Sequence, residues 1–193
     1  MKDFPFVLND HVSLATEMMQ TRLRLNLANY EVLSQLCYEE QVKCQAKVND
    51  LVGRQLNTGS SKQVCEFLYN ELKLKPKKNH KTGAVTSDEN ALRELRVEHP
   101  QHKEVLNAFI EDRKISKKID SYIEILFDED GYIPHSANPA GTETNRWAFS
   151  KSPRERGFNT QTAPKVMRIM SDPPPGRVFI CPDLPQADAR IVA

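Results

Sequence analysis

The sequence contains little of what several protein classes require. No apolar run approaches the roughly 18 residues of a membrane-spanning helix and no signal peptide opens the chain, so we expect a cytoplasmic protein with no membrane partner. Its four cysteines show neither CxxC spacing nor flanking histidine pairs. This pattern favours reduced, buried thiols over a metal site.

What is present suffices for a packed core. The 193 residues are 39% apolar and 27% charged, which disfavours disorder and allows one domain, or one small domain and part of another. The net charge of +1 is segregated: residues 73–81 hold five lysines and a histidine without an acid, and residues 141–170 hold six Lys or Arg against two Glu. Such segments are typical either of solvated loops or of a surface that grips a phosphate backbone.

Helical periodicity dominates the first two thirds of the chain. Residues 1–22 have weak periodicity, and we expect only a lead-in of uncertain order there. Helices are predicted over residues 29–52, 61–72, 87–99 and 103–127. Gly53 stands at the C-cap position of the first helix, and Ser60–Gln63 and Thr86–Glu89 form capping boxes at the starts of the second and third.

The last third of the chain has a mixed pattern. Asp130–Gly131 is a turn signal, and residues 132–135 are predicted to form a strand. Residues 138–164 are polar, basic and without periodicity, and long loops of this kind usually have a function. Residues 177–181 (RVFIC) are predicted to form a buried strand that ends at Pro182–Asp183 and is followed by the start of a helix. The expected fold is mainly α with a small α/β part.

An aspartate at the end of a buried strand can hold a divalent cation. The strand fixes the carboxylate of Asp183, a neighbouring backbone carbonyl can add a ligand, and Mg²⁺ prefers oxygen ligands. An aspartate after a strand is also a common helix cap. The choice between these interpretations depends on the surrounding motifs.

Six short motifs occur in one order along the chain. These are Asn57, Ser60, Lys62 and Gln63; Lys81–Gly83 with Thr86–Ser87; Arg113, Lys117, Ser121 and Tyr122; Thr142, Thr144 and Arg146; Phe158–Pro164 (FNTQTAP); and Asp183–Arg190 (DLPQADAR). Through them, residues 23–193 resemble the family A DNA polymerases, those related to bacterial DNA polymerase I.

The resemblance implies both a fold and an activity. It implies a helical thumb over residues 23–127, followed over residues 128–193 by the first strand–helix piece of a palm, which ends just after the first catalytic motif. The implied activity is that of a DNA-directed DNA polymerase. Its partners would be primer–template duplex DNA and, in the complete enzyme, deoxynucleoside triphosphates and Mg²⁺.

The resemblance also implies roles for single residues. Asp183 would bind both catalytic Mg²⁺ ions and the Leu184 carbonyl one of them, and Gln186 and Asp188 would lie at the incoming nucleotide. Contacts with DNA are expected, from the basic segments and from the resemblance, at Lys77, Lys78, Lys81, Thr142, Arg146, Asn159, Gln161 and Lys165.

Three of these side chains suit the minor groove, where acceptors occupy similar positions in every base pair. Donors from Arg146, Asn159 and Gln161 can therefore test pairing geometry without reading sequence, as a copying enzyme needs. By the resemblance, Arg146 would lie near the primer terminus.

The sequence departs from the family pattern at several positions. Pro185 replaces a serine, Asp188 a glutamate, Asn145 a glycine, Thr160 a leucine and Ala163 an isoleucine. Proline is tolerated in the first turn of a helix, and asparagine can adopt a positive φ. Thr160 and Ala163 remove apolar volume and so weaken packing, whereas Asp188 keeps the carboxylate but is one methylene shorter than glutamate.

Two-metal phosphoryl transfer needs a second carboxylate, which the family takes from a His-Asp-Glu motif. The 193 residues contain no His-Asp pair. We therefore expect an incomplete part of a polymerase that binds primer–template DNA and is inactive alone. The alternative is a non-catalytic DNA-binding module or one chain of a split polymerase, and the reading frame after Ala193 would discriminate between them.

Overall fold

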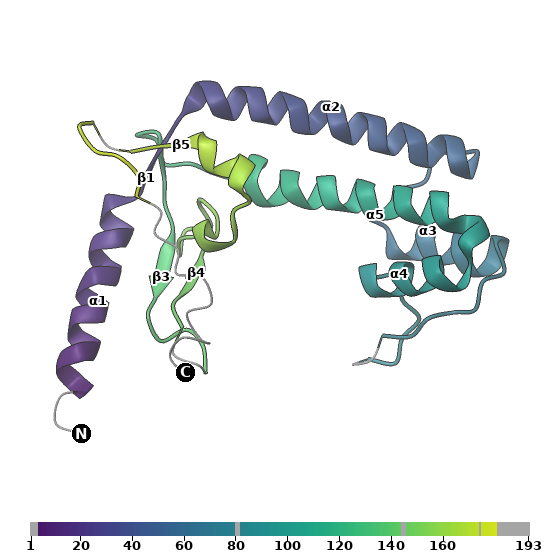
Figure 1. The fold of residues 1–193 in the computed structure, drawn as a ribbon, viewed down its shortest axis with the longest axis horizontal. Helices are drawn as coiled ribbons and strands as arrows, with labels where there is room; N and C mark the ends of the chain where they lie inside the picture. Colours follow the sequence, from purple (N-terminus) through teal and green to yellow (C-terminus); the bar gives the residue numbers. More distant parts are fainter. Residues whose placement is uncertain (1–3, 80–81, 144–145, 174, 181–193) are drawn as a thin grey trace. The chain divides into compact units, whose positions relative to one another are not determined.

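The computed structural model describes residues 4–79, 82–143, 146–173 and 175–180. The chain divides into two compact units, one of residues 28–125 and the other of residues 1–27 together with residues 126–193. The fold is mostly helical, with small antiparallel sheets (Figure 1). No helix in the described ranges is both long and apolar enough to cross a membrane.

The first unit, residues 28–125, consists of helices. They are α2 (Leu27–Val52), α3 (Ser61–Cys65), the π-helix η1 (Glu66–Glu71), α4 (Glu89–Glu98), the 3₁₀-helix η2 (Pro100–His102), α5 (Lys103–Lys118) and the π-helix η3 (Ile119–Ile123). The helices predicted over residues 61–72 and 103–127 thus each finish in π-helical geometry, and the second of them ends four residues early, at Ile123.

Helix α2 lies antiparallel to α5 and its π-helical extension (Figure 1). Near the start of α2, the Tyr30 hydroxyl donates a 2.9 Å hydrogen bond to the carbonyl of Ile123, the last residue of η3. Near its end, Lys47 Nζ lies 3.1 Å from Glu111 Oε2, in the middle of α5. These contacts join the two helices at both ends.

The core of this unit lies between α3–η1, α4 and α5. Its fully buried side chains include Val48, Val64, Leu68, Leu92, Leu95, Leu106 and Phe109. The rings of Phe67 and Phe109 meet edge to face, with centroids 5.8 Å apart, a geometry that adds to the stabilisation from apolar burial. The core therefore fixes the end of the unit from which the loop between η1 and α4 projects.

Two predicted helix ends are confirmed. Gly53 adopts φ +77°, and its N–H donates a 2.8 Å hydrogen bond to the carbonyl of Asn49. This left-handed C-terminal residue is one that glycine adopts without strain. At the start of α3, the Ser60 hydroxyl accepts from the N–H of Gln63 at 3.4 Å. The reciprocal half of the predicted capping box is not formed, because Gln63 Oε1 accepts from the N–H of Asn57 and the N–H of Ser60 donates to the carbonyl of Asn57.

The predicted Thr86–Glu89 capping box is wrong. Asp88 is the N-cap of α4, and its carboxylate accepts a 2.9 Å hydrogen bond from the N–H of Ala91. The Thr86 hydroxyl instead accepts from the N–H of Asp88 at 3.2 Å. An aspartate caps at least as well as a threonine, and the backbone of residues 86–87 belongs to the preceding loop.

The second unit combines one helix with short strands. Its elements are α1 (Phe4–Thr21), β1 (Leu23–Leu25), β2 (Tyr132–Ile133), β3 (Ser136–Asn138), β4 (Ala148–Ser150), the 3₁₀-helices η4 (Thr160–Thr162) and η5 (Lys165–Met170), and β5 (Ser171–Asp172). Helix α1 occupies most of the stretch for which the sequence predicted only a lead-in. The turn at Asp130–Gly131 and a strand at residues 132–133 are confirmed.

Strand β1 is the centre of a three-stranded antiparallel sheet with the order β2-β1-β5. Leu23 pairs with Ile133, and Leu25 with Ser171. Residues 23–27, which the sequence grouped with the helical region, therefore lie in the second unit. β3 and β4 form a separate antiparallel hairpin.

An ion-pair cluster fixes the chain just before β1. Arg22 Nη1 lies 2.8 Å from Asp128 Oδ2, and Nη2 lies 2.7 Å from Asp130 Oδ2. The guanidinium also lies over the Tyr132 ring, 4.7 Å from its centroid. Hydrogen bonds to the two carboxylates raise the pKa of Arg22, and the same interaction lowers the pKa of Asp130. Arg22 adopts φ +51°, so these contacts hold a backbone conformation that is strained for arginine.

The strand predicted over residues 177–181 is wrong for its described part. Residues 177–180 form no strand, and the side chains of Val178 and Ile180 are 77% and 82% exposed. Within the described ranges no neighbouring strand pairs with them. An apolar run predicts a buried strand only where the fold supplies a partner strand and a covering layer. Cys181 lies outside the described residues.

Candidate nucleic-acid interface

The basic loop, residues 73–86, joins η1 to α4 and folds back on itself. Lys78 and Val85 form an antiparallel bridge, and the N–H of Asn79 donates to the carbonyl of Ala84 at 2.9 Å. Gly83 completes the turn with φ +69°. The loop is thus a short hairpin that projects from the helical unit (Figure 1).

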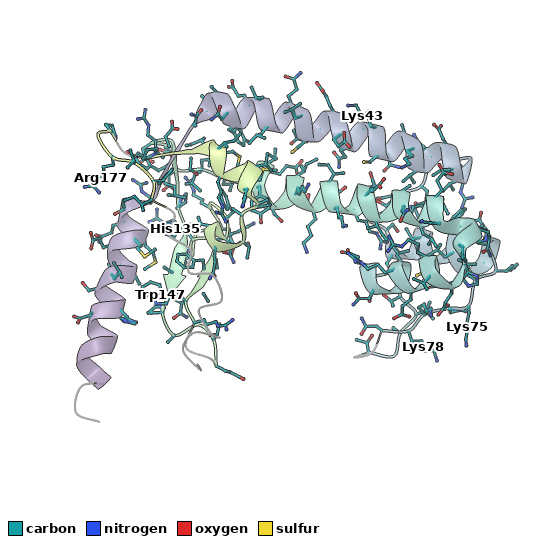
Figure 2. All side chains as sticks on the ribbon, viewed as in Figure 1. Lys43, Lys75, Lys78, His135, Trp147 and Arg177 are labelled. Atoms are coloured by element: carbon teal, nitrogen blue, oxygen red, sulfur yellow. The ribbon has the colours of Figure 1, made fainter. Side chains whose placement is uncertain are left out.

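The lysines of the basic loop differ in their surroundings. Lys77 Nζ lies 2.5 Å from Glu98 Oε1 and 3.1 Å from Glu94 Oε2, and its side chain is only 18% exposed. Hydrogen bonds to Glu98 and then to Glu94 raise the pKa of Lys77. Lys75 and Lys78 are exposed, as Figure 2 shows, and form no ion pair with a described residue. Lys81 lies outside the described residues.

A buried polar network connects the base of this loop to α5. The Arg113 guanidinium donates from Nε to the carbonyl of Thr58 at 2.7 Å, from Nη1 to the carbonyl of Ser87, and from Nη2 to the Ser87 hydroxyl at 3.2 Å. Thr58 in turn donates to Asp112 Oδ2. Burial lowers the pKa of Arg113. Segments around residues 58, 87 and 113, which carry three of the sequence motifs, thereby meet at one place.

Sequence reasoning missed part of this network. Thr58, Ser87 and Asp112 are each at most 2% exposed, and Asp112 Oδ1 has no hydrogen-bond partner among the described residues. Asp112 is a charged residue next to an arginine on a helix, and nothing in that pattern predicts that its side chain is buried. One sequence signal could have indicated the network. Residues 57–63 and 86–87 are polar motif segments that lie next to apolar residues in the sequence.

A polar hollow of about 350 Å³ lies beside the Asn57–Gln63 motif, lined by Gln45, Asn49, Gln55 and that motif's two amides. Asn49 Oδ1 accepts from the N–H of Leu56 at 3.1 Å, and Gln63 Oε1 accepts from the N–H of Asn57 at 2.9 Å. The amide oxygens are therefore used within the chain. The –NH₂ groups of Asn49 and Gln63 make no hydrogen bond within the described residues, which leaves them available as donors.

The second unit presents a different set of predicted residues. The Thr142 hydroxyl accepts from the N–H of Arg146 at 2.8 Å and donates to the carbonyl of Arg146 at 3.2 Å. This contact closes the loop between β3 and β4, and it places the exposed Arg146 two residues before β4. Thr144 and Asn145 lie outside the described residues.

Residues 158–167 alternate between buried anchors and outward polar groups. Phe158, Ala163 and Met167 are buried at 3%, 5% and 2% exposure, whereas Gln161 and Lys165 are exposed. η4 packs against β4, so Gln161 lies on the element next to the strand that follows Arg146. The anchors hold the backbone while the polar side chains face outward.

Asn159 caps the short helix η4. Its Oδ1 accepts from the N–H of Gln161 at 3.0 Å and from the N–H of Thr162 at 3.4 Å. Its amide nitrogen makes no hydrogen bond within the described residues. Asn159 is therefore available only as a donor, which is the role that the sequence predicts for it.

Gly157 permits the close packing of this segment. It adopts φ +72°, and a Cβ at this position would lie 1.7 Å from the carbonyl oxygen of Pro134. Its N–H donates to the carbonyl of Leu126 at 2.7 Å. Sequence reasoning did not single out this glycine, although it stands directly before the FNTQTAP motif.

Aromatic rings support the β3–β4 hairpin. Trp147 stacks on Phe149 with centroids 6.4 Å apart and meets His11 of α1 at 5.8 Å. The Phe149 ring also lies 5.9 Å from His135, which is 7% exposed (Figure 2). Burial lowers the pKa of His135, and its Nδ1 has no hydrogen-bond partner among the described residues. These aromatic rings join α1 to the β3–β4 hairpin, whose connecting loop contains Arg146.

The residues predicted at the metal and nucleotide site lie outside the described residues. This applies to Asp183, Leu184, Gln186 and Asp188. In the described part of the chain, no three His, Cys, Asp or Glu side chains are arranged to hold a metal ion. Cys37, Cys44 and Cys65 are free thiols there, and burial raises the pKa of Cys37 and Cys44. The sequence predicted buried thiols, but only Cys37 is buried, and Cys44 and Cys65 are half-buried.

The fold agrees with the comparisons to known proteins. Residues 28–193 match the profile of "DNA polymerase family A". The chain therefore belongs to this family. It is 26% identical over 182 residues to DNA polymerase I of Synechocystis sp., which covers 89% of this chain and 17% of that protein. It is 31% identical over 144 residues to the DNA polymerase of Escherichia phage T5, which covers 71% of this chain and 16% of that protein.

A solved structure with a similar fold is the POL domain of Pol1 from M. smegmatis, in complex with DNA primer-template and dNTP. The TM-score is 0.60 at 22% sequence identity, with 77% of this chain and 26% of that chain covered. The chain thus spans about a sixth of the length of the two curated relatives named above.

Proposed function

We propose that this chain is the duplex-holding part of a DNA-directed DNA polymerase. In this proposal, residues 23–127 form a thumb, whose helical body is residues 28–125 with β1 outside it, and residues 128–193 form the start of a palm. The chain belongs to family A and has two compact units. The observation that carries the proposal is that, in each unit, buried residues hold the segment whose exposed side chains are predicted to contact DNA. In one unit the anchor is the Arg113 network, and in the other it is the row Phe158, Ala163 and Met167.

The basic loop would contact the phosphate backbone. Lys75 and Lys78 are exposed and have no carboxylate partner among the described residues, so they can approach a phosphate without first breaking an ion pair. Contacts of this kind contribute affinity but no sequence information. Binding through the loop is therefore expected to be independent of sequence.

The outward donors of the second unit would contact the minor groove. Arg146, Asn159 and Gln161 belong to the β4–η4 neighbourhood, and Asn159 is available only as a donor. Minor-groove acceptors lie at similar positions in all four base pairs, so these donors suit any correctly paired duplex. Thr142 and Lys165 flank the same surface in sequence and would contact the backbone.

The nucleotide and metal site remains a proposal that depends on the family resemblance. Asp183 and the Leu184 carbonyl would hold Mg²⁺, and Gln186 and Asp188 would contact the incoming deoxynucleoside triphosphate. The donor set fits, because a carboxylate and a backbone carbonyl are hard oxygen ligands. The metal would supply activation of the primer hydroxyl and charge neutralisation at the phosphates.

The chain alone would bind primer–template DNA without extending it. The 193 residues supply one carboxylate at the implied metal site and no His-Asp pair, whereas two-metal transfer needs a second carboxylate. Primer extension with the purified chain, Mg²⁺ and all four deoxynucleoside triphosphates is expected to give no product. Templated extension that is lost in Asp183→Asn would overturn this proposal.

Duplex binding itself is tested by competition. A labelled primer–template duplex bound to the chain should be displaced equally well by unlabelled duplexes of unrelated sequence. A strong preference for one sequence would contradict a copying enzyme and would favour a sequence-specific DNA-binding module.

A further inference from the structure

Lys77 is enclosed by two carboxylates of α4. Glu94 and Glu98 are one turn apart on that helix, and Lys77 Nζ lies 3.1 Å from the first and 2.5 Å from the second. The Lys77 side chain is 18% exposed, whereas its neighbour Lys78 is exposed. The sequence gives no sign of this difference, because all the lysines of the loop belong to one basic run.

The charge around Lys77 is unfavourable for an anion. One lysine and two glutamates carry a net charge of −1 at neutral pH. A phosphate that approached Lys77 would have to displace two charge-assisted hydrogen bonds and would meet the released carboxylates. Lys75 and Lys78 are exposed and form no ion pair with a described residue, so a phosphate that approached either of them would displace none.

Fixing Lys77 also fixes the second limb of the hairpin. The carbonyl of Lys77 accepts a 2.9 Å hydrogen bond from the N–H of Thr86, and the carbonyl of Thr86 accepts from the Tyr69 hydroxyl at 2.5 Å. The next residue, Ser87, is held by Arg113. The two limbs of the basic loop are therefore anchored together, one on α4 and the other on the helical core.

We propose that Lys77 is a positioning residue, a latch that docks the basic loop on α4 so that Lys75 and Lys78 face the phosphate backbone. It does not contact DNA itself, in contrast to the role that the sequence predicts. This inference rests on the proposed function of the loop. The Lys77–Glu94–Glu98 triad itself is a property of the free chain.

The latch is tested first without DNA, by hydrogen exchange of the amides of Asn79, Gly83 and Thr86, which are hydrogen-bonded within the loop. Lys77→Met keeps the apolar stem and removes the charge. It should speed exchange at these amides by about two- to fivefold, the range expected for a partly exposed ion-pair network. Glu94→Gln with Glu98→Gln should do the same. Lys78→Met, the matched control, should leave exchange unchanged.

The position of Lys77 relative to DNA is tested by duplex binding over a range of salt concentrations. Lys78→Met removes a phosphate contact and should lower the salt slope by about one. Lys77→Met should weaken binding at every salt concentration with an unchanged slope. The direction of the change in duplex affinity for Glu94→Gln with Glu98→Gln is decisive. A latch predicts weaker binding. A direct contact between Lys77 and phosphate predicts tighter binding, because the neutral side chains no longer compete for Lys77.

A charge-matched control separates the latch from a general gain of positive charge. Glu66 and Glu104 are exposed and have no ion pair among the described residues, and their double change to Gln should bind duplex slightly more tightly than the unmodified chain. Either of two results would overturn the latch. One is unchanged amide exchange in Lys77→Met. The other is a salt slope lower by about one in Lys77→Met together with tighter duplex binding in Glu94→Gln with Glu98→Gln. If the unmodified chain binds no duplex, the proposed function fails, and the exchange result still decides whether the latch exists.

Discussion

Arg113 of α5 holds Ser87 at the foot of the basic loop, donating from Nη1 to its carbonyl and from Nη2 to its hydroxyl at 3.2 Å. A third hydrogen bond, from Nε to the carbonyl of Thr58, ties in the segment before α3. The guanidinium has the shape for this task, because its planar set of donors can satisfy several acceptors at once. Two loops that carry separate sequence motifs are thereby attached to one helix.

Arg113→Met should destabilise the chain by about 2–3 kcal/mol, because it leaves two carbonyls of the network without their donor. Urea unfolding measures the loss. The control is Arg93→Met, which removes an exposed pair with Glu89 on α4 and should cost less than about 0.5 kcal/mol. Equal losses in the two variants would show that the network contributes no more than a surface ion pair.

Gly157→Ala should be severely destabilising, by more than about 3 kcal/mol, because the new Cβ would overlap the carbonyl oxygen of Pro134 and the backbone must move. Gly131→Ala is the matched control. Gly131 has a similar φ of +76°, but a Cβ there meets nothing within 4 Å, so only the conformational cost of about 1 kcal/mol remains. Thermal unfolding of both variants separates steric overlap from backbone strain, and similar losses would contradict the close packing at Gly157.

Stability should fall on acidification in a way that depends on His135. Its folded-state pKa is lowered by burial from 6.5, so the unfolded chain binds the proton more readily. The contribution of neutral His135 to the free energy of unfolding is therefore fully present above pH 6.5. It is lost as the pH falls below that value toward the lower folded-state pKa. His135→Phe keeps a ring against Phe149 and cannot titrate.

Urea unfolding of both forms between pH 8 and pH 5 checks this point. As the pH falls, the unfolding free energy of the unmodified chain should decrease relative to that of His135→Phe. Parallel pH profiles would show that protonation of His135 is not coupled to folding.

The parts of the fold that depend on local sequence were predictable. The helix that ends at Gly53, the Ser60 cap and the turn at Gly131 follow from backbone preferences that act within a few residues. The choice of Asp88 over Thr86 as a cap was missed, because either residue can accept the required hydrogen bond. Three-dimensional context decided it.

The parts that depend on distant partners were not predictable. Lys77 looks like its neighbours in sequence, and only the fold brings Glu94 and Glu98 to it. Leu23–Leu25 is too short to be recognised as a strand, yet it lies between β2 and β5. Conversely, the apolar residues Val178 and Ile180 predicted a buried strand where the described chain offers no partner.

The salt dependence of duplex binding tests the central claim most directly, because it counts phosphate contacts. For the unmodified chain, the logarithm of the binding constant should fall linearly with the logarithm of salt concentration. The slope should become shallower by about one for Lys75→Met, for Lys78→Met and for Lys165→Met, each taken singly. Binding that is absent, or that has a slope near zero in all these forms, would contradict a chain that holds duplex DNA through its basic surfaces.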